Sequence, residues 1–534
     1  PPPPLPDPDA NPDAPPPVRN VRITFTGDSR YVVSTTYPPK ADTDKAKREK
    51  KKPEEMPKGG LVIVDLATFE AKTVASVKSV QVPAKAGDWI AYLTESKEAA
   101  PPARPGVTRK EYGTDLVVRD LMSGRERTFG SVPQYAVSRD GMTLLYTVSS
   151  KTETENGVFA MNAGSRTDAP VALASGPGRY LKLTWDREQK RAAFVSDRDD
   201  AASKAPKLKA YLWERSARPA AAVAVVDAST PGMPATLAVS DKGQLSFSRD
   251  GGRLYVPTAP PAAPPKAEDD TPADEKVVAD IWNYKDDLVQ PMQRIRAAQE
   301  RNRTFRGAYT IATKTYAQLA DNTLRTVVMS DDGARAVGLD DAPYRRMIDF
   351  DGTYNDVYLV NGATGERKAV LKKWRGGGFG APFQWSPSGD FAVFYADRHW
   401  HALNAKDGTV RNLTASLSVS FADEEDDTPD PADSYGSAGW TKDRASFLAY
   451  DRFDVWQLFA DGRAPRNLTE GEGRKAKVIY RVERTEPVDE EDDERGLDPA
   501  KPLTLRGEND LTHETGFYRD SFDGAAAPAK LVSA

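Results

Sequence analysis

The chain has 534 residues, of which 39% are hydrophobic, and a formal net charge of −5 from 74 basic and 79 acidic side chains. This slightly acidic balance gives no sign of the positively charged surface that nucleic-acid binding needs, which argues against nucleic acid as a main partner. The absence of cysteine excludes disulfides, thiolate nucleophiles, iron–sulfur clusters and cysteine zinc sites.

The N-terminal segment 1–17 contains ten prolines. Proline lacks the amide hydrogen that a sheet ladder needs, so this segment is expected to be an extended, disordered tether. No apolar run elsewhere approaches the roughly 20 residues that span a bilayer. The remainder, 18–534, is expected to form one β-rich domain.

A short cassette recurs eight times in this domain. Each copy places a polar turn with Asp or Gly ahead of a strand rich in β-branched and aromatic residues. The spacing is mostly 45 to 65 residues, with one gap of 82. The copies lie at Gly27, Gly87, Gly141, Asp186, Gly251, Gly333, Gly389 and Asp443.

A second cassette, a strand–turn–strand unit, follows each first one, as in GGLVIVDLATFEAKTV and HWHALNAKDGTVRNLT. Two hairpins make a four-stranded antiparallel sheet, and one such sheet cannot bury both of its faces. Radial stacking of the sheets solves this problem, so the fold class is predicted to be all-β, a β-propeller of about eight blades. The alternative, a string of separate β-sandwiches, would need boundary linkers that the sequence lacks.

Four charged or proline-rich segments interrupt the repeat and are expected to be loop insertions: 41–58, 259–275, 422–433 and 486–495. Runs of like charge repel one another and stay solvated. The acidic runs lack the spaced ligands and the glycine of a calcium-binding loop. We therefore expect no metal site in them.

The gap of 82 residues contains the segment 277–321, which departs from the two-residue period of a strand. Good helix formers fill 290–303, and Pro291 stands near the start, where proline is tolerated. One short helical insertion is therefore predicted here.

This predicted helix carries the candidate substrate-binding residues: Arg294, Arg296, Glu300, Arg301 and Arg303. Guanidinium groups bind carboxylates through two parallel hydrogen bonds, so an arginine cluster facing the centre of the propeller would hold an acidic group or the C-terminus of a substrate. The alternative is a surface helix whose arginines form ion pairs with nearby acidic residues.

The run DIWNYKDDLVQPMQRIRAAQERNR, at 280–303, resembles a segment of the N-terminal propellers of bacterial prolyl-oligopeptidase-type serine peptidases, the S9 family. The cassettes WSPSGDFAVFYA and GTVRNLT and the late stretch GFYRDSFDGAAAPAKLV are similar to those propellers as well. The blade cassettes also resemble many TolB-like propellers, and the 280–303 run is the more discriminating.

The resemblance implies that an α/β-hydrolase domain follows the propeller and carries serine, aspartate and histidine in that order. The propeller would cap that site and admit only short or unfolded peptides. Dipeptidyl members hold the substrate's amino terminus with neighbouring glutamates. Here Glu300 stands alone between glutamine and arginine, so exopeptidase and endopeptidase action both stay open.

No G-x-S-x-G nucleophile motif occurs in the chain; the nearest string is the Gly-Ser-Ala-Gly ending at Gly439. We therefore expect no catalytic residue and no cofactor within these 534 residues. The expected function is that of a substrate-gating propeller of an S9 serine peptidase, with the hydrolase domain beyond residue 534. The alternative is a stand-alone TolB-like propeller that binds a protein or peptide partner. The proline-rich tether and the usual location of the family that the chain resembles lead us to expect a periplasmic or secreted protein.

Three further patterns are expected to be structural. His399 and His401 share a strand face but lack a third zinc ligand. The Asn-Leu-Thr strings at Asn412 and Asn467 are predicted to end equivalent strands. The last pattern comprises tryptophans that precede polar turns and are expected to pack between blades: Trp185, Trp385 and Trp440.

Overall fold

The computed structural model describes residues 23–96, 112–165, 168–261, 281–376, 383–485, 496–524 and 526–533. Nine antiparallel sheets follow one another along the chain, and each is built from strands that are consecutive in sequence. The predicted all-β propeller class is confirmed. Within these ranges no helix is long and apolar enough to cross a membrane.

The first four sheets contain strands β1 to β16. Sheet one has β1 (Ile23–Phe25), β2 (Tyr31–Thr36), β3 (Gly60–Asp65) and β4 (Ala71–Ala75). Sheet two has β5 (Val77–Gln81), β6 (Trp89–Thr94), β7 (Thr114–Asp120) and β8 (Glu126–Val132). Sheet three has β9 (Tyr135–Val137), β10 (Thr143–Val148), β11 (Gly157–Asn162) and β12 (Val171–Ser175). Sheet four has β13 (Tyr180–Trp185), β14 (Arg191–Ser196), β15 (Lys209–Glu214) and β16 (Val223–Val226).

The fifth sheet has a divided first strand, because two short segments, β17 (Ala238–Val239) and β18 (Ser246–Phe247), both pair with β19 (Arg253–Ala259). It continues with β20 (Phe305–Thr310) and β21 (Thr315–Gln318). Sheet six has β22 (Thr326–Met329), β23 (Arg335–Asp340), β24 (Tyr354–Asn361) and β25 (Arg367–Arg375).

The last three sheets again have four strands each. Sheet seven has β26 (Gln384–Trp385), β27 (Phe391–Ala396), β28 (His399–Asn404) and β29 (Val410–Asn412). Sheet eight has β30 (Ser437–Trp440), β31 (Phe447–Tyr450), β32 (Val455–Leu458) and β33 (Arg466–Asn467). Sheet nine has β34 (Val478–Val482), β35 (Leu503–Asn509), β36 (Thr515–Asp520) and β37 (Ala529–Ser533).

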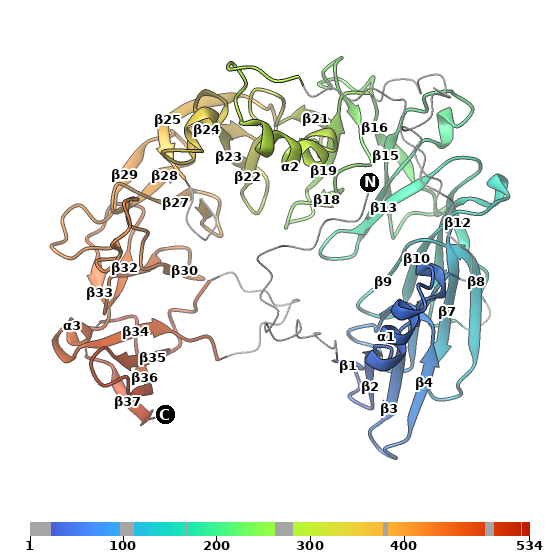
Figure 1. The fold of residues 1–534 in the computed structure, drawn as a ribbon, viewed down its shortest axis with the longest axis horizontal. Helices are drawn as coiled ribbons and strands as arrows, with labels where there is room; N and C mark the ends of the chain where they lie inside the picture. Colours follow the sequence, from blue (N-terminus) through green and yellow to red (C-terminus); the bar gives the residue numbers. More distant parts are fainter. Residues whose placement is uncertain are drawn as a thin grey trace.

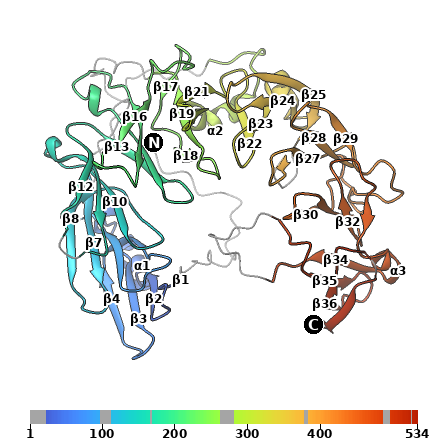
Figure 2. The ribbon, with the colours of Figure 1, turned by 180° about the vertical axis from the view of Figure 1, so that it is seen from behind.

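The sheets are arranged as blades around a common centre (Figure 1). First strands such as β9, β18, β22 and β30 lie toward the centre, and last strands such as β8, β25, β29 and β33 lie toward the rim. Sheets one and nine stand at the two ends of an arc and are apart in both views (Figures 1 and 2). No sheet combines described strands from the two ends of the chain.

The structure has nine blades where the turn cassettes indicated about eight. The eight cassettes mark the first eight sheets. Sheet nine was missed because no tight polar turn joins its first two strands: β34 and β35 are separated by residues 483–502, which include the acidic run 486–495 outside the described residues.

The hydrophobic core is divided among the junctions between sheets. Eight clusters of buried residues are present in the described structure, and each combines residues of two successive sheets. The first, for example, joins Tyr31 and Val33 of sheet one to Ile90 and Tyr92 of sheet two. Stacking therefore buries the two faces that a single sheet leaves open.

A buried side-chain oxygen closes the first turn of seven sheets. Each accepts a hydrogen bond from the backbone N–H five residues later, at 2.8 to 3.2 Å. Local hydroxyl and carboxylate bonds of this kind stabilise turns. The seven residues are Thr26, Ser138, Asp186, Ser248, Ser330, Ser386 and Thr441. Asp186 is the only carboxyl among them, and burial raises the pKa of Asp186.

The predicted positions of Trp385 and Trp440 between blades are confirmed. The indole N–H of Trp385 donates to the backbone carbonyl of Val328 in sheet six at 2.9 Å, and the indole N–H of Trp440 donates to the backbone carbonyl of Gln384 in sheet seven at 3.1 Å. Trp185 packs in the core between sheets three and four. Each tryptophan thus ties its first strand to the preceding sheet.

The inserted segments differ in part from the predicted loops. Segment 41–58 contains a helix, α1 (Lys40–Arg48), and a 3-10 turn, Pro53–Glu55. A loop was expected because lysines dominate the sequence, but alanine and lysine also favour helix. Segment 422–433 contains no helix or strand. For the 259–275 segment, Ala259 still belongs to β19, and residues from 262 on lie outside the described part of the chain, as does the tether 1–17.

Besides α1, the described residues contain α2 (Gln290–Arg301) and α3 (Glu472–Ala476). The remaining 3-10 helices are Glu153–Glu155, Arg198–Asp200 and Ala342–Met347. The helical insertion predicted at 290–303 corresponds to α2 and ends two residues earlier than expected.

Candidate functional site

Helix α2 is inserted between β19 and β20 of sheet five, at the junction with sheet six (Figure 1). Its first turn contains Pro291, and the side-chain amide of Gln293 bonds back to Asp286 at 3.1 Å and to the carbonyl of Leu288 at 2.8 Å. No residue of α2 is buried. The helix therefore lies on the surface and presents its side chains to the surroundings.

The structure brings two of the predicted site residues, Glu300 and Arg303, into direct contact. Arg303 Nε donates to Glu300 at 2.9 Å, and Arg325, in the loop before β22, approaches the same carboxylate at 3.4 Å. The hydrogen bonds from Arg303 lower the pKa of Glu300. Desolvation and the like charges of Arg345 and Arg303 lower the pKa of Arg325. Glu300, in the last turn of α2, thus pairs with Arg303 just beyond the helix and with Arg325 beside the first strand of sheet six.

The other three candidates do not join this group. Arg294 is exposed and Arg296 is partly buried, and neither makes an ion pair with a described carboxylate. Arg301 is exposed, and its carbonyl accepts a hydrogen bond from Lys242 Nζ at 2.6 Å. The five residues therefore do not converge on one point, and a substrate-binding role for them stays a prediction.

A large apolar surface lies beside the start of α2. Trp282, Tyr284 and Phe350 are 64%, 86% and 77% exposed. They line a cavity of about 590 Å³ together with Val289 and Pro291. Exposed aromatic side chains gathered in this way are typical of contact surfaces for other proteins.

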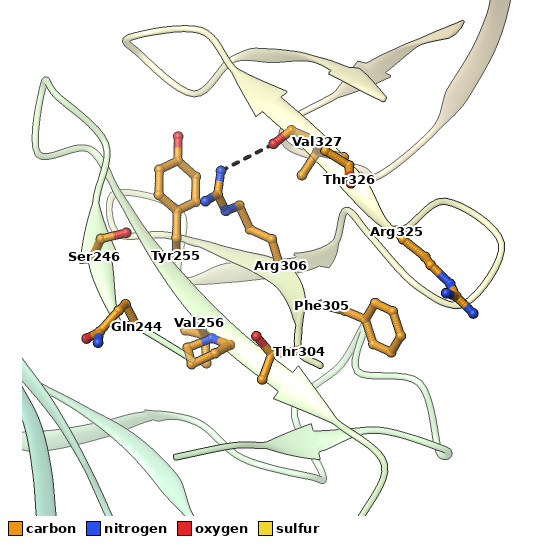
Figure 3. Close-up of a pocket in the computed structure, with 11 residues that line it drawn as sticks. Gln244, Ser246, Tyr255, Val256, Thr304, Phe305, Arg306, Arg325, Thr326 and Val327 are labelled. Atoms are coloured by element: carbon orange, nitrogen blue, oxygen red, sulfur yellow. Dashed lines mark hydrogen bonds between the residues drawn. The ribbon is translucent and has the colours of Figure 1, made fainter. Parts of the chain in front are cut away.

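A second cavity, of about 280 Å³, lies at the junction of sheets five and six (Figure 3). Strands β18, β19 and β20 of sheet five and β22 of sheet six form its walls. Its lining contains two arginines, Arg306 and Arg325, and no carboxylate; the other lining residues are Gln244, Ser246, Tyr255, Val256, Pro257, Thr304, Phe305, Thr326 and Val327.

Arg306 is the unusual group of this cavity. Its guanidinium lies over the ring of Tyr255, 5.3 Å from the ring centroid, and Nη1 donates to the carbonyl of Val327 at 3.4 Å (Figure 3). The residue is exposed and makes no ion pair with any described carboxylate. Protein atoms around the guanidinium desolvate it and thereby lower the pKa of Arg306.

The structural roles expected for the histidines agree with their contacts. His399 Nδ1 lies 3.0 Å from the hydroxyl of Thr414, and His401 Nδ1 lies 3.2 Å from the carbonyl of His399. The ring of His401 stacks on Phe394, and burial lowers the pKa of His401. In the part of the chain that the structure describes, no three acidic or histidine side chains form a metal-binding group.

Ser437, in the string closest to a nucleophile motif, is part of β30. Its hydroxyl accepts a hydrogen bond from the side-chain amide of Gln384 at 3.3 Å. Asn412 and Asn467 end the last strands of sheets seven and eight, at the equivalent positions that the sequence predicted. These residues are accounted for by the blade structure.

No protein-family model and no curated protein matches the chain. Among solved structures, the chain is similar to a prolyl endopeptidase at 13% identity, with 82% of this chain and 55% of that one covered and a TM-score of 0.28. It thus spans only about half of that protein. It is also similar to the β-propeller domain of the Trilobed protease from Pyrococcus furiosus, at 12% identity over 74% and 98%, TM-score 0.29.

A third similar structure is dipeptidyl peptidase 4 from Porphyromonas gingivalis, at 10% identity over 92% of this chain and 65% of that chain, with a TM-score of 0.35. All three likenesses are distant. The fold assigned to the chain rests on its own nine sheets and their eight junctions.

Sequence reasoning missed Arg306 and the cavity. An alternating strand pattern would have placed Arg306 opposite its neighbours, since Phe305 and Gly307 are buried and Arg306 is exposed. The cavity exists because β20 of sheet five lies beside β22 of sheet six. The sequence pattern within one blade does not predict the space between two blades.

Proposed function

We propose that the chain is the substrate-gating propeller of a prolyl-oligopeptidase-type serine peptidase that acts on peptides. In this proposal a hydrolase domain of the same protein carries out the chemistry, and the propeller restricts access by its size and charge. Blades arranged around a centre provide the steric part of such a gate.

The observation that carries the proposal is the 280–303 run that resembles S9 propellers. Its described part forms a surface insertion with helix α2, tied to sheet six through Glu300 and Arg325. The insertion takes no part in the pairing of the blade, because every residue of β20 already pairs with β19. The segment therefore supports a role outside the fold.

The proposal assigns no catalytic residue to the 534 residues. The chain has no G-x-S-x-G motif, and Ser437 is engaged by Gln384 within a blade. Nucleophilic attack would need a serine with an adjacent base, which the proposal places in the hydrolase domain.

The test uses the protein isolated from its native source. Its intact mass and its reaction with a fluorophosphonate probe, which labels active serine hydrolases, are measured together. We expect a mass larger than 58.3 kDa by about one domain, roughly 25–30 kDa, and labelling of one serine beyond residue 534. A protein of 58.3 kDa that the probe does not label would contradict the proposal.

A stand-alone binding propeller is the second candidate, and the apolar surface at Trp282, Tyr284 and Phe350 favours it. Such a protein would show the smaller mass and would elute with a partner on gel filtration. Replacing Tyr284 with Ser would then release the partner.

A further inference from the structure

We propose that the cavity between sheets five and six binds a carboxylate group of a peptide, with Arg306 as the residue that recognises it. The inference goes beyond the gating role and does not depend on catalysis. It would hold for a propeller with or without an attached hydrolase domain.

The charges at the cavity favour a single negative charge in the ligand. Of the two lining arginines, Arg325 already faces Glu300 at 3.4 Å, and Arg306 has no described carboxylate partner. No lining residue is acidic. One uncompensated guanidinium matches a carboxylate, whereas a phosphate dianion would require a second free cation.

The geometry of Arg306 leaves the donors that a carboxylate needs. Only Nη1 is engaged, by the carbonyl of Val327 at 3.4 Å, so Nε and Nη2 carry hydrogens that no described acceptor takes. The guanidinium lies over the ring of Tyr255, with its central carbon 5.3 Å from the ring centroid, and this cation–π contact favours the observed position. A guanidinium held in this way is prepared for two parallel hydrogen bonds.

Neutral polar groups surround the same space. The side chains of Ser246, Thr304 and Thr326 line the cavity and make no hydrogen bond with any described residue. Hydroxyl groups can donate to a carboxylate oxygen or accept from a peptide N–H. The walls can therefore satisfy the polar atoms next to the charged group of a ligand.

The size and access of the cavity suit the end of a peptide. Its volume of about 280 Å³ lies at the lower end of ligand cavities, which span roughly 300–1,000 Å³. Arg306 is exposed, so a ligand can reach it from solvent. A terminal residue fits this space, whereas most of a longer peptide would remain outside.

The first experiment measures binding to the full chain by calorimetry at low salt. N-acetyl-alanyl-alanine is compared with its C-terminal amide, with an acetylated glutamate diamide that carries only a side-chain carboxylate, and with sodium sulfate. We expect the two ligands that carry a carboxylate to bind at least about 10-fold more tightly than the C-terminal amide. The amide cannot form the charged, hydrogen-bonded pair with Arg306. The tighter of the two carboxylates identifies the main-chain or the side-chain source.

The second experiment tests Arg306 with matched variants. Arg306→Gln is expected to weaken binding of N-acetyl-alanyl-alanine about 10-fold or more, and Arg306→Lys by a smaller factor, because lysine keeps the charge but loses the fork. Arg411→Gln makes the same change in net charge at an exposed arginine of β29, and it is expected to leave the affinity unchanged.

A third measurement needs no variant and so remains informative if Arg306→Gln does not fold. Phenylglyoxal modifies accessible arginines, and mass spectrometry reports which ones. N-acetyl-alanyl-alanine is expected to protect Arg306 and not Arg411. Several results would overturn the proposal. In the first experiment these are equal binding of acid and amide, preference for sulfate, or no saturable binding. In the other two they are unchanged affinity in Arg306→Gln and protection of arginines other than Arg306.

Discussion

Two neighbouring carbonyls of β22 are satisfied in different ways, and the contrast separates a structural junction from a candidate binding site. Val328 accepts the indole N–H of Trp385 from sheet seven at 2.9 Å. Val327 accepts a guanidinium hydrogen of Arg306 from sheet five at 3.4 Å. The same strand thus meets a buried aromatic ring on one side and an accessible cation on the other.

The surroundings of Trp385 and Arg306 differ in how tightly they are packed. Trp385 is 6% exposed and belongs to the core shared by sheets six and seven. Arg306 leaves a cavity of about 280 Å³ beside it. The buried core that sheets five and six share, with Phe305 and Val327, lies next to this cavity. We therefore expect that core, and not Arg306, to hold the junction, which agrees with the binding role proposed for Arg306.

The largest predicted effect tests this contrast directly. Trp385→Ala should lower the free energy of unfolding by about 3–5 kcal/mol, because it leaves a large hole in a packed core. Arg306→Ala should change it by less than about 1 kcal/mol. Urea unfolding followed by circular dichroism measures both.

Trp282→Ala is the matched control for the tryptophan, because Trp282 is 64% exposed and its loss should leave stability nearly unchanged. If Arg306→Ala were as costly as Trp385→Ala, Arg306 would be a structural residue of its junction, and the contrast with Trp385 would fail.

A buried carboxyl group in sheet nine extends the comparison, because only one of its two oxygens, Oδ1, accepts a hydrogen bond, from the Ser521 N–H at 2.7 Å. Asp520, at the end of β36, is 7% exposed, and its Oδ2 has no described partner. Burial raises the pKa of Asp520 to about 6, above the value of about 3.9 in an unfolded chain. The folded state therefore holds the proton more strongly, so stability is lost as the pH rises through about 6.

Asp520→Asn should remove this loss and raise the free energy of unfolding by about 2 kcal/mol at pH 7 relative to wild type, with a smaller difference at pH 4. The Tm at several pH values reports it. Asp42→Asn makes the same change in charge at an exposed position of α1 and serves as the control. An equal gain in stability in both variants would rule out burial as the cause.

The turn that follows β22 gives a smaller effect. The buried Ser330 hydroxyl accepts from the N–H of Arg335 at 3.1 Å and donates to Asp332 at 2.7 Å. Ser330→Ala should cost about 1–2 kcal/mol, because a buried N–H loses its side-chain acceptor. Ser418→Ala, at an exposed serine, serves as the control in the same urea experiment. A similar loss of unfolding free energy in Ser418→Ala would show that the buried hydroxyl of Ser330 does not stabilise the turn.

The smallest effect on stability is expected at the rim of the cavity. Glu300→Gln removes an exposed ion pair and should change the free energy of unfolding by less than about 1 kcal/mol. It also frees Arg325, so affinity for N-acetyl-alanyl-alanine should rise. Calorimetry tests this, and a weaker affinity in the variant would show that Arg325 does not act on the cavity.

Much of the fold could be predicted because its signals are local. Turn residues such as Gly141 and Gly333 adopt left-handed φ values of 68° and 64°, where glycine is favoured. The structure also shows non-glycine residues in this conformation at other first turns, for example Gln189 and Arg444. The count fell one short because sheet nine has a long connection where the others have a tight turn.

The candidate site was less accessible to prediction. Helix α2 could be predicted from its composition and Pro291, and Glu300 was correctly placed among arginines. Arg306 was missed because its importance depends on a neighbour that it lacks and on Val327, 21 residues away in another blade. A sequence pattern predicts the strand on which Arg306 lies. That no described carboxylate pairs with Arg306 is seen only in the packed structure of sheets five and six.

The division of the core among junctions has a consequence for synthesis. The core between sheets one and two uses residues from Tyr31 to Leu121 only, so it can form while the ribosome is still making sheet three. Every later sheet then docks on a surface that is already complete. A nascent chain of this protein would expose one unpaired sheet face at a time, and a chaperone would need to protect only the blade being made.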